Sequence, residues 1–365
     1  MSRPFSQIDF SRTPLLAIWE TTRSCALACR HCRAKAEWGR SPDELTTKEG
    51  FALIKSFSDM GTRLLVLSGG DPLNRPDLED LAAYGHALGL RVATIPAATP
   101  ALTQERLRSL KTAGVEQIAL SLDAPNAEEH DEFRRFPGAY GIVMKAAGWA
   151  KAEGIPLQIN TCFGAWNIGQ IEKMAELVRL MGAVFWEVFF LVSVGRGAEL
   201  QGISAQDFES AFARLAAIAD RKDFVVKLTE AQHYRRYLAL AKAKSAAVGG
   251  RGLGALAGST GQAVNSGKGF LFVDYRGKIY PSGFLPIPAG DARQDDVASV
   301  YRGSELFRML RDFKNLKGKC GRCEFSAICS GSRARAYAAT GDILGEDPSC
   351  LYAPGSRRNP EVISA

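Results

Sequence analysis

Short runs of strand-forming residues alternate with amphipathic helical stretches over the first 220 residues of this chain. The predicted strands cover residues 15–21, 63–67, 91–95, 117–122, 156–161 and 184–191. Each is followed by a predicted helix, at 46–60, 77–88, 103–112, 140–153, 168–180 and 204–219. Parallel strands need such helical crossovers because a tight turn cannot join them. The pattern predicts an α/β protein with βα units, either an open doubly wound sheet or a partial barrel, with the chemistry on loops after the strand ends.

The last third of the chain has a different pattern and predicts a smaller second unit. Residues 244–268 are rich in Gly, Ala and Ser and have no periodic apolar face, which predicts a linker or a mobile lid. Two short apolar runs, 270–273 and 278–280, flank a turn sequence and predict a β-hairpin, and a helix is predicted near 304–313. We therefore divide the chain into an N-terminal segment (1–14), a βα domain (15–225), a helix with a linker or lid (226–268) and a C-terminal domain (269–365).

The composition restricts the partners that we expect. Hydrophobic residues make up 46% of the chain and charged residues 23%, as in ordinary globular proteins. The net charge is +7, and the Lys and Arg residues are scattered along the sequence. This distribution suits an acidic small substrate better than a nucleic acid. We find no signal-peptide core and no apolar run of the roughly 18 residues that a membrane span needs. The expected location is the cytoplasm.

Three cysteines, Cys25, Cys29 and Cys32, lie within eight residues directly after the first predicted strand. In a reducing compartment, clustered thiols favour metal ligation over disulfides. A four-iron cluster held by three thiolates keeps one iron open, so that it can bind a ligand as well as pass an electron. The alternative is a zinc site completed by His31, although a closed structural zinc site uses four ligands.

This CxxxCxxC spacing after the first strand resembles the signature of the radical S-adenosylmethionine (SAM) superfamily. The resemblance implies a partial (β/α)6 TIM-like barrel and a [4Fe–4S] cluster that cleaves SAM reductively to a 5′-deoxyadenosyl radical, which takes hydrogen from a substrate. Ser68-Gly69-Gly70-Asp71-Pro72 resembles the family's GGEP-type motif, with Asp in place of Glu. Where many relatives carry an Asn-Gly turn after the third strand, this chain reads Ile95-Pro96-Ala97-Ala98-Thr99. The SAM contacts that the resemblance implies are Gly69, Gly70, Asp71, Pro72, Ser121, Asp123, Arg134, Asn160, Leu191 and Val192.

Four further cysteines lie near the C-terminus and imply a closed metal site: Cys320, Cys323, Cys329 and Cys350. Zinc and an auxiliary [4Fe–4S] cluster are both compatible with four thiolates. The combination with the first motif resembles the SPASM/twitch subgroup, which favours the auxiliary cluster. Ser282 stands where full members of that subgroup place a cysteine ligand, so we expect one auxiliary cluster. The remaining Cys162 is interpreted as a core thiol.

The substrate is the least determined part of the sequence analysis. The positive charge, the single auxiliary cluster and the segment 194–197 favour a tetrapyrrole or haem precursor whose carboxylate side chain is modified. The alternatives are a maturase of ribosomally made peptides and a non-enzymatic iron–sulfur electron carrier. A ferredoxin- or flavodoxin-type protein is the expected electron donor, and the oligomeric state is left open. Arg333 and Arg335 are interpreted as an exposed basic face or as anchors for substrate carboxylates.

Overall fold

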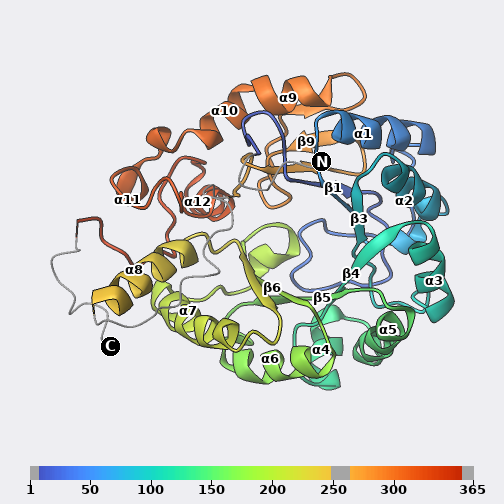
Figure 1. Cartoon of the computed structure of the whole chain (residues 1–365), viewed down its shortest axis with the longest axis horizontal. Coiled ribbons are helices and arrows are strands. Elements are labelled where there is room, and N and C mark those ends of the chain that lie inside the picture. The colour runs from blue at the N-terminus through green and yellow to red at the C-terminus, as the bar shows by residue number, and fades with distance from the viewer. Residues whose placement is uncertain (1–7, 248–263, 356–365) are drawn as a thin grey trace.

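A curved sheet of ten strands forms the frame of the molecule in this computed structural model, which describes residues 8–247 and 264–355 (Figure 1). The strand order is β10-β9-β8-β1-β2-β3-β4-β5-β6-β7. Strands β1 to β7 are parallel, β8 pairs in parallel with β1, and β9 and β10 complete an antiparallel edge. The bounds are β1 Leu16–Glu20, β2 Leu64–Ser68, β3 Arg91–Thr94, β4 Val115–Ser121, β5 Leu157–Phe163, β6 Phe185–Phe190, β7 Val225–Thr229, β8 Phe270–Val273, β9 Lys278–Tyr280 and β10 Gly290–Asp291.

Helices cover the outer side of this sheet, and the strands surround the interior (Figure 1). Side chains at the helix starts satisfy the first free backbone N–H groups; Thr46 and Ser204, for example, form capping boxes before α1 and α7. The α-helices are α1 Thr47–Asp59, α2 Leu78–Ala87, α3 Gln104–Thr112, α4 Ala127–Arg134, α5 Ala139–Glu153, α6 Ile171–Leu180, α7 Ala205–Asp220, α8 Tyr234–Ala247, α9 Val297–Gly303, α10 Glu305–Arg311, α11 Gly318–Gly321 and α12 Arg333–Thr340. Short 3₁₀ helices are η2 Pro72–Asn74, η3 Ile168–Gln170, η4 Gly195–Glu199 and η5 Phe313–Asn315.

Most of the predicted elements are confirmed, and the structure adds others. The six predicted strands and the C-terminal hairpin are present within a few residues of their expected bounds. The six βα units predicted in the first 220 residues are confirmed, and β7 and α8 continue the parallel series past residue 225. The predicted helix at 140–153 is preceded by a separate short helix, α4. The α/β partial-barrel class itself is confirmed.

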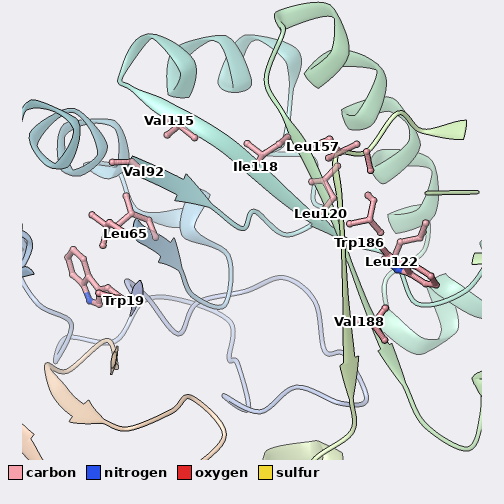
Figure 2. Close-up of a cluster of buried hydrophobic side chains, with 14 of the residues drawn as sticks. Trp19, Leu65, Val92, Val115, Ile118, Leu120, Leu122, Leu157, Trp186 and Val188 are labelled. Atoms are coloured by element: carbon pink, nitrogen blue, oxygen red, sulfur yellow. The ribbon is translucent and has the colours of Figure 1, made fainter. Parts of the chain in front are cut away.

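The two faces of the sheet have different chemistry because side chains alternate along each strand. The outer face is apolar: Trp19, Leu65, Val92, Leu120 and Trp186 are fully buried or nearly so and point toward the helices (Figure 2). The inner face carries polar side chains at the strand ends, among them Glu20, Ser68, Ser121 and Asn160. The hydrophobic core therefore lies between sheet and helices, which leaves the interior of the barrel for a polar site.

The C-terminal hairpin joins the βα strands in one continuous sheet, since β8 pairs with β1 from Leu16↔Phe270 to Trp19↔Val273. The sheet has no break at the division near residue 268 that the sequence suggested, and that division stays a prediction. Most of the expected linker or lid, residues 248–263, lies outside the described residues, and α8 occupies its first positions. None of the helices in the described ranges combines the length and apolar character that crossing a membrane requires.

Two helical glycines should respond in opposite ways to alanine. A Cβ at Gly50 in α1 would lie 2.6 Å from Trp19 Cη2, whereas one at the exposed Gly148 in α5 meets nothing within 4 Å. We expect Gly50→Ala to destabilise the protein by about 1–3 kcal/mol through overpacking. Gly148→Ala should stabilise it by about 0.5–1 kcal/mol through helix propensity. Urea unfolding of both variants measures the difference, and stabilisation by Gly50→Ala would contradict the packing of α1 on β1.

Candidate active site

The three N-terminal cysteines lie in an irregular loop between β1 and α1, at the carboxyl end of the parallel strands. Cys25 and Cys29 are buried and Cys32 is half-buried. Each sulfur accepts one hydrogen bond: Leu27 N–H donates to Cys25 Sγ (3.3 Å), Ala36 N–H to Cys32 Sγ (3.4 Å) and Arg134 Nη1 to Cys29 Sγ (3.6 Å). Burial raises the pKa of Cys25 to about 12, so a thiolate at this position needs a cationic partner such as iron.

Arg196 fixes the shape of this loop from the other side of the barrel. It follows β6 in η4, and its Nε donates to Cys29 O (2.9 Å) while its Nη1 donates to Ala36 O (3.1 Å). Its backbone N–H donates to Cys32 O (3.0 Å). The preceding Gly195 has φ +60°, and a Cβ there would lie 2.5 Å from Cys32 O, so a larger residue would separate the two segments.

The glycine turn after β2 packs directly against the cysteine loop. Gly70 N–H donates to Thr22 O (2.8 Å), and a Cβ at Gly70 would lie 2.5 Å from Ser24 O. Gly69 and Gly70 line the cavity that holds the three cysteines. The turn therefore brings backbone groups close to any ligand bound beside the cysteine loop.

Asp71 and Pro72 do not line this cavity. Asp71 is fully buried and accepts hydrogen bonds from Leu73 N–H (3.1 Å), Ala97 N–H (3.2 Å) and Thr99 Oγ1 (2.9 Å). Its carboxylate thus holds together the turns after β2 and β3. This contact also gives a role to Thr99, in the segment that replaces the Asn-Gly turn of relatives.

Asp123 and Arg134 form a buried ion pair of 2.5 Å at the end of β4 and in α4. Asp123 also accepts from Cys162 N–H (2.9 Å), and its own N–H donates to His130 Nδ1 (3.2 Å). The terminal nitrogens of Arg134 contact Asp123 and Cys29, and its role in binding the carboxylate of SAM stays a prediction. Burial lowers the pKa of His130 and of His31 to about 4, so both rings are neutral at pH 7.

A single cavity with about 1220 Å³ of empty space, part of it open to solvent, connects these groups. Three buried nitrogens at it, His31 Nδ1, His130 Nε2 and Arg134 Nε, have no protein partner in the described part of the chain. The predicted site residues that line it are Cys25, Cys29, Cys32, Gly69, Gly70, Ser121, Asp123, Arg134, Asn160, Leu191 and Val192. Arg33, Phe189 and Phe284 also line the cavity and were not predicted from the sequence, and Cys162, interpreted as a core thiol, lies there too.

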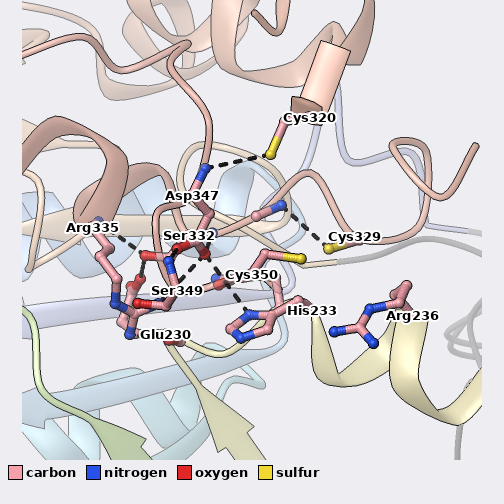
Figure 3. A network of polar contacts seen from close by, with 12 residues as sticks. Glu230, His233, Arg236, Cys320, Cys329, Ser332, Arg335, Asp347, Ser349 and Cys350 are labelled. Atoms are coloured by element: carbon pink, nitrogen blue, oxygen red, sulfur yellow. Dashed lines mark hydrogen bonds and ion pairs between the residues drawn. The ribbon is translucent and has the colours of Figure 1, made fainter. Parts of the chain in front are cut away.

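The four C-terminal cysteines line a second, smaller cavity with about 380 Å³ of empty space, partly open to solvent. Asp347 N–H donates to Cys320 Sγ (3.4 Å), as Figure 3 shows, and Gly331 N–H donates to Cys329 Sγ (3.4 Å). Arg236 also lines the cavity and is held by an ion pair with Glu209. Within the described ranges, no three His, Cys, Asp or Glu side chains are grouped at the spacing of a single metal ion.

Arg333 and Arg335 were interpreted as an exposed basic face or as substrate anchors; the exposed face is wrong for both residues, and the anchor role stays a prediction. Only 1% of Arg333 and 7% of Arg335 is exposed, and neither lines the cavity of the first cysteine cluster. Arg333 Nη1 donates to Ile343 O (3.1 Å) and Gly345 O (2.7 Å), and its Nη2 lies 3.8 Å from Cys320 Sγ. Arg335 donates to Glu230 O (2.5 Å) (Figure 3). Both guanidinium groups therefore support the loops that carry the second cysteine cluster.

Comparison with known proteins identifies the class of this site. The profile of the Radical SAM superfamily matches residues 19–178. The chain is 40% identical over 351 residues to the AdoMet-dependent heme synthase of Methanosarcina barkeri, covering 96% of this chain and 100% of that protein. The enzyme of the same name from Nitratidesulfovibrio vulgaris is 38% identical, with 95% and 94% covered. The PqqA peptide cyclase of Rhizobium meliloti is 28% identical, with 93% and 88% covered.

The fold is shared with the SAM-bound crystal structure of Streptococcus suis SuiB (TM-score 0.71, 15% identity, 93% of this chain and 78% of that one covered). This chain belongs to the radical SAM superfamily, whose enzymes use a [4Fe–4S] cluster together with SAM. It is therefore an enzyme of radical chemistry, which excludes the interpretation as a simple electron carrier.

Arg196→Gln should weaken retention of the N-terminal cluster, because the loop loses its contacts to Cys29 O and Ala36 O. We expect iron loss to a chelator to become about tenfold faster, as for other groups that support metal ligands. The matched control is Arg30→Gln in the same loop, whose side chain is partly exposed and pairs with Glu132 at 3.5 Å. Absorbance and iron content followed anaerobically report the loss, and equal rates in the two variants would contradict the role given to Arg196.

Proposed function

We propose that this enzyme converts a tetrapyrrole precursor to haem by modifying its carboxylate side chains. The observation that carries the proposal is the 40% identity to an AdoMet-dependent heme synthase over essentially the full length of both proteins. The cavity supports it, because aromatic and aliphatic side chains from β6 and the segment after β9 lie beside a cation in its wall. A flat, apolar ring with anionic edges matches such a lining.

The residues of the first site fit the cluster and SAM. Cys25, Cys29 and Cys32 would hold the cluster, since all three sulfurs face one cavity and already accept hydrogen bonds. Gly69, Gly70, Ser121, Asp123, Arg134, Asn160, Leu191 and Val192 would hold SAM, and Asp71 and Pro72 would support the turn. When bound, the two groups supply a 5′-deoxyadenosyl radical that removes one hydrogen atom from the substrate.

The protein's own contribution is to place the substrate near the radical and to exclude groups that would quench it. In the proposed reaction a propionate, –CH₂–CH₂–COO⁻, gives up a hydrogen atom from the carbon next to the ring. Loss of CO₂ and of one further electron then leaves a vinyl group, –CH=CH₂, so atoms and charge balance. The wall must hold that carbon near the radical and keep quenching groups away. Leu191, Val192 and Phe189 supply unreactive surface beside the predicted SAM site.

The electron that leaves the substrate needs an acceptor, and the four C-terminal cysteines are the candidates to hold it. The four thiols line one cavity, and no three metal-binding side chains in the described ranges are grouped for a single metal ion, which supports a multi-iron cluster over one zinc ion. The side chains of Arg236 and Arg333 would offset part of the negative charge of a cluster with four thiolates. Such cations and hydrogen bonds favour the reduced state.

We further propose a ferredoxin- or flavodoxin-type electron donor and a cytoplasmic location. Clustered free thiols need a reducing compartment, and reductive cleavage of SAM needs an external one-electron source. We keep the division at residue 268 as a functional one, with the SAM site on one side and the second cysteine cluster on the other.

Peptide maturation is the second candidate function, favoured by the 28% identity to a PqqA peptide cyclase over most of the chain. To separate the two, anaerobically reconstituted enzyme is incubated with SAM, a reductant and iron-coproporphyrin III, and in parallel with a PqqA-type precursor peptide. We expect 5′-deoxyadenosine in step with vinyl-containing product from the tetrapyrrole, and none from the Cys25/Cys29/Cys32 triple Ala variant. Turnover of the peptide with an unchanged tetrapyrrole would overturn the haem proposal.

Metal analysis tests the second cysteine cluster. The reconstituted wild type should hold about eight irons, and variants lacking either cysteine set should hold about four, as two four-iron clusters require. Four irons with one zinc in the wild type would replace the auxiliary cluster by a structural zinc site. Mössbauer or EPR spectra of the two variants assign each cluster to its cysteines.

A further inference from the structure

Arg33 directly follows the last cysteine of the loop and lines the large cavity. Its Nη2 lies 2.8 Å from Glu20 Oε2, and its guanidinium carbon lies 4.4 Å from the centre of the Phe272 ring. Glu20 ends β1 and Phe272 belongs to β8, so the group sits where the βα strands meet the C-terminal hairpin. The Arg33 side chain is 23% exposed, in contrast to 4% for Glu20.

The surroundings of Arg33 hold its guanidinium in one position. A Cβ at Gly283 would lie 3.2 Å from both Cζ and Nε of Arg33, so the glycine leaves the space that the guanidinium fills. Phe272 also approaches that position, with its Cδ2 3.2 Å from the same Cβ. Glu20, which is buried, supplies the counter-charge for the partly buried guanidinium. An arginine fixed by ring, glycine and carboxylate has lost most of its rotamer freedom before any ligand arrives.

Arg33 also has hydrogen-bond donors that its contact with Glu20 does not use. A guanidinium carries five N–H groups, and among the described residues Arg33 pairs with Glu20 through Nη2, which leaves Nε and Nη1 for a ligand. The other arginine in the cavity wall, Arg134, is engaged by Asp123 and by Cys29. Among the described residues, Arg33 therefore keeps two unused donor groups in this wall, Nε and Nη1, whereas Arg134 keeps only Nε.

We propose that Arg33 is the anchor for a substrate carboxylate, binding it through Nε and Nη1 while Glu20 and Phe272 hold the guanidinium in place. The paired donors of arginine match a carboxylate and fix its orientation. Phe284 and Phe189, whose ring centres lie 6.2 Å apart, line the same cavity and would contact the apolar part of the substrate. The anchor would set which side chain meets the radical. This inference rests on the proposed function for the identity of the carboxylate carrier.

The first test is a binding titration with two probes, iron-coproporphyrin III and its fully methyl-esterified form, in the presence of SAM and without reductant. For the acid probe, Arg33→Gln should raise Kd by about tenfold or more, since hydrogen bonds to charged groups are the strong ones. The ester should bind wild type and variant alike. Arg30→Gln is the matched control in the same loop, and it should bind the acid probe like the wild type.

A second variant separates anchoring from damage to the cluster loop, because Arg33 adjoins Cys32. Gly283→Ala lies outside that loop and displaces the guanidinium through its Cβ, so it should weaken binding of the acid probe with iron content and substrate-free SAM cleavage unchanged. Normal binding of the acid probe by both Arg33→Gln and Gly283→Ala would overturn the anchor. The anchor would also be overturned if only Arg33→Gln bound the acid probe weakly and that variant had lost iron. Loss of SAM cleavage in iron-replete Arg33→Gln would assign Arg33 to SAM instead. Failure of the wild type to bind either probe would instead reject the tetrapyrrole proposal itself.

Discussion

The parallel pairing of β1 with β2 on one edge and with β8 on the other is the constraint on which the rest of the structure depends. Parallel strands end at a common rim, so the loops after β1, β2, β4, β5 and β6 meet in one place. The cysteine loop, the glycine turn, Asp123 and Asn160 come from separate parts of the sequence and line one cavity for this reason. The second pairing brings the C-terminal hairpin, and with it Phe272 and Gly283, against Arg33 in the cavity wall.

Buried arginines give an irregular loop the rigidity that a metal site needs. Residues 21–46 contain no helix or strand, yet Arg75 joins the two ends of this segment by donating to Thr21 O and Leu45 O. Arg196 donates to carbonyls in its middle, and Arg134 contacts a cysteine sulfur directly. A guanidinium is suited to this task because it remains charged when buried and offers several donors in one plane. The inner face of the barrel stays polar, while the apolar outer face supplies the stability.

The two cysteine clusters lie in different electrostatic surroundings, which agrees with different tasks. The first cluster loop opens on a large cavity with groups left for a ligand. The second lies among helices and loops at a smaller cavity, partly open to solvent, with Arg236, Lys319 and Arg333 beside its four thiols. An open coordination site next to a substrate cavity suits the cleavage of SAM, and a site with cations beside the thiols suits reversible electron storage.

The sequence by itself determined the βα order, the strand positions, the hairpin and the two cysteine clusters, because these depend on local periodicity and on the spacing of chemically distinctive residues. It did not reveal β7 or α4, whose patterns are short and weak. Only the tertiary structure decided the partners of the arginines: Arg134 faces Asp123, Arg333 and Arg335 are buried supports, and Arg33 lines the cavity. The physical reason is that a cation's role depends on the carboxylates, carbonyls and space that distant segments bring to it, and no local pattern encodes these.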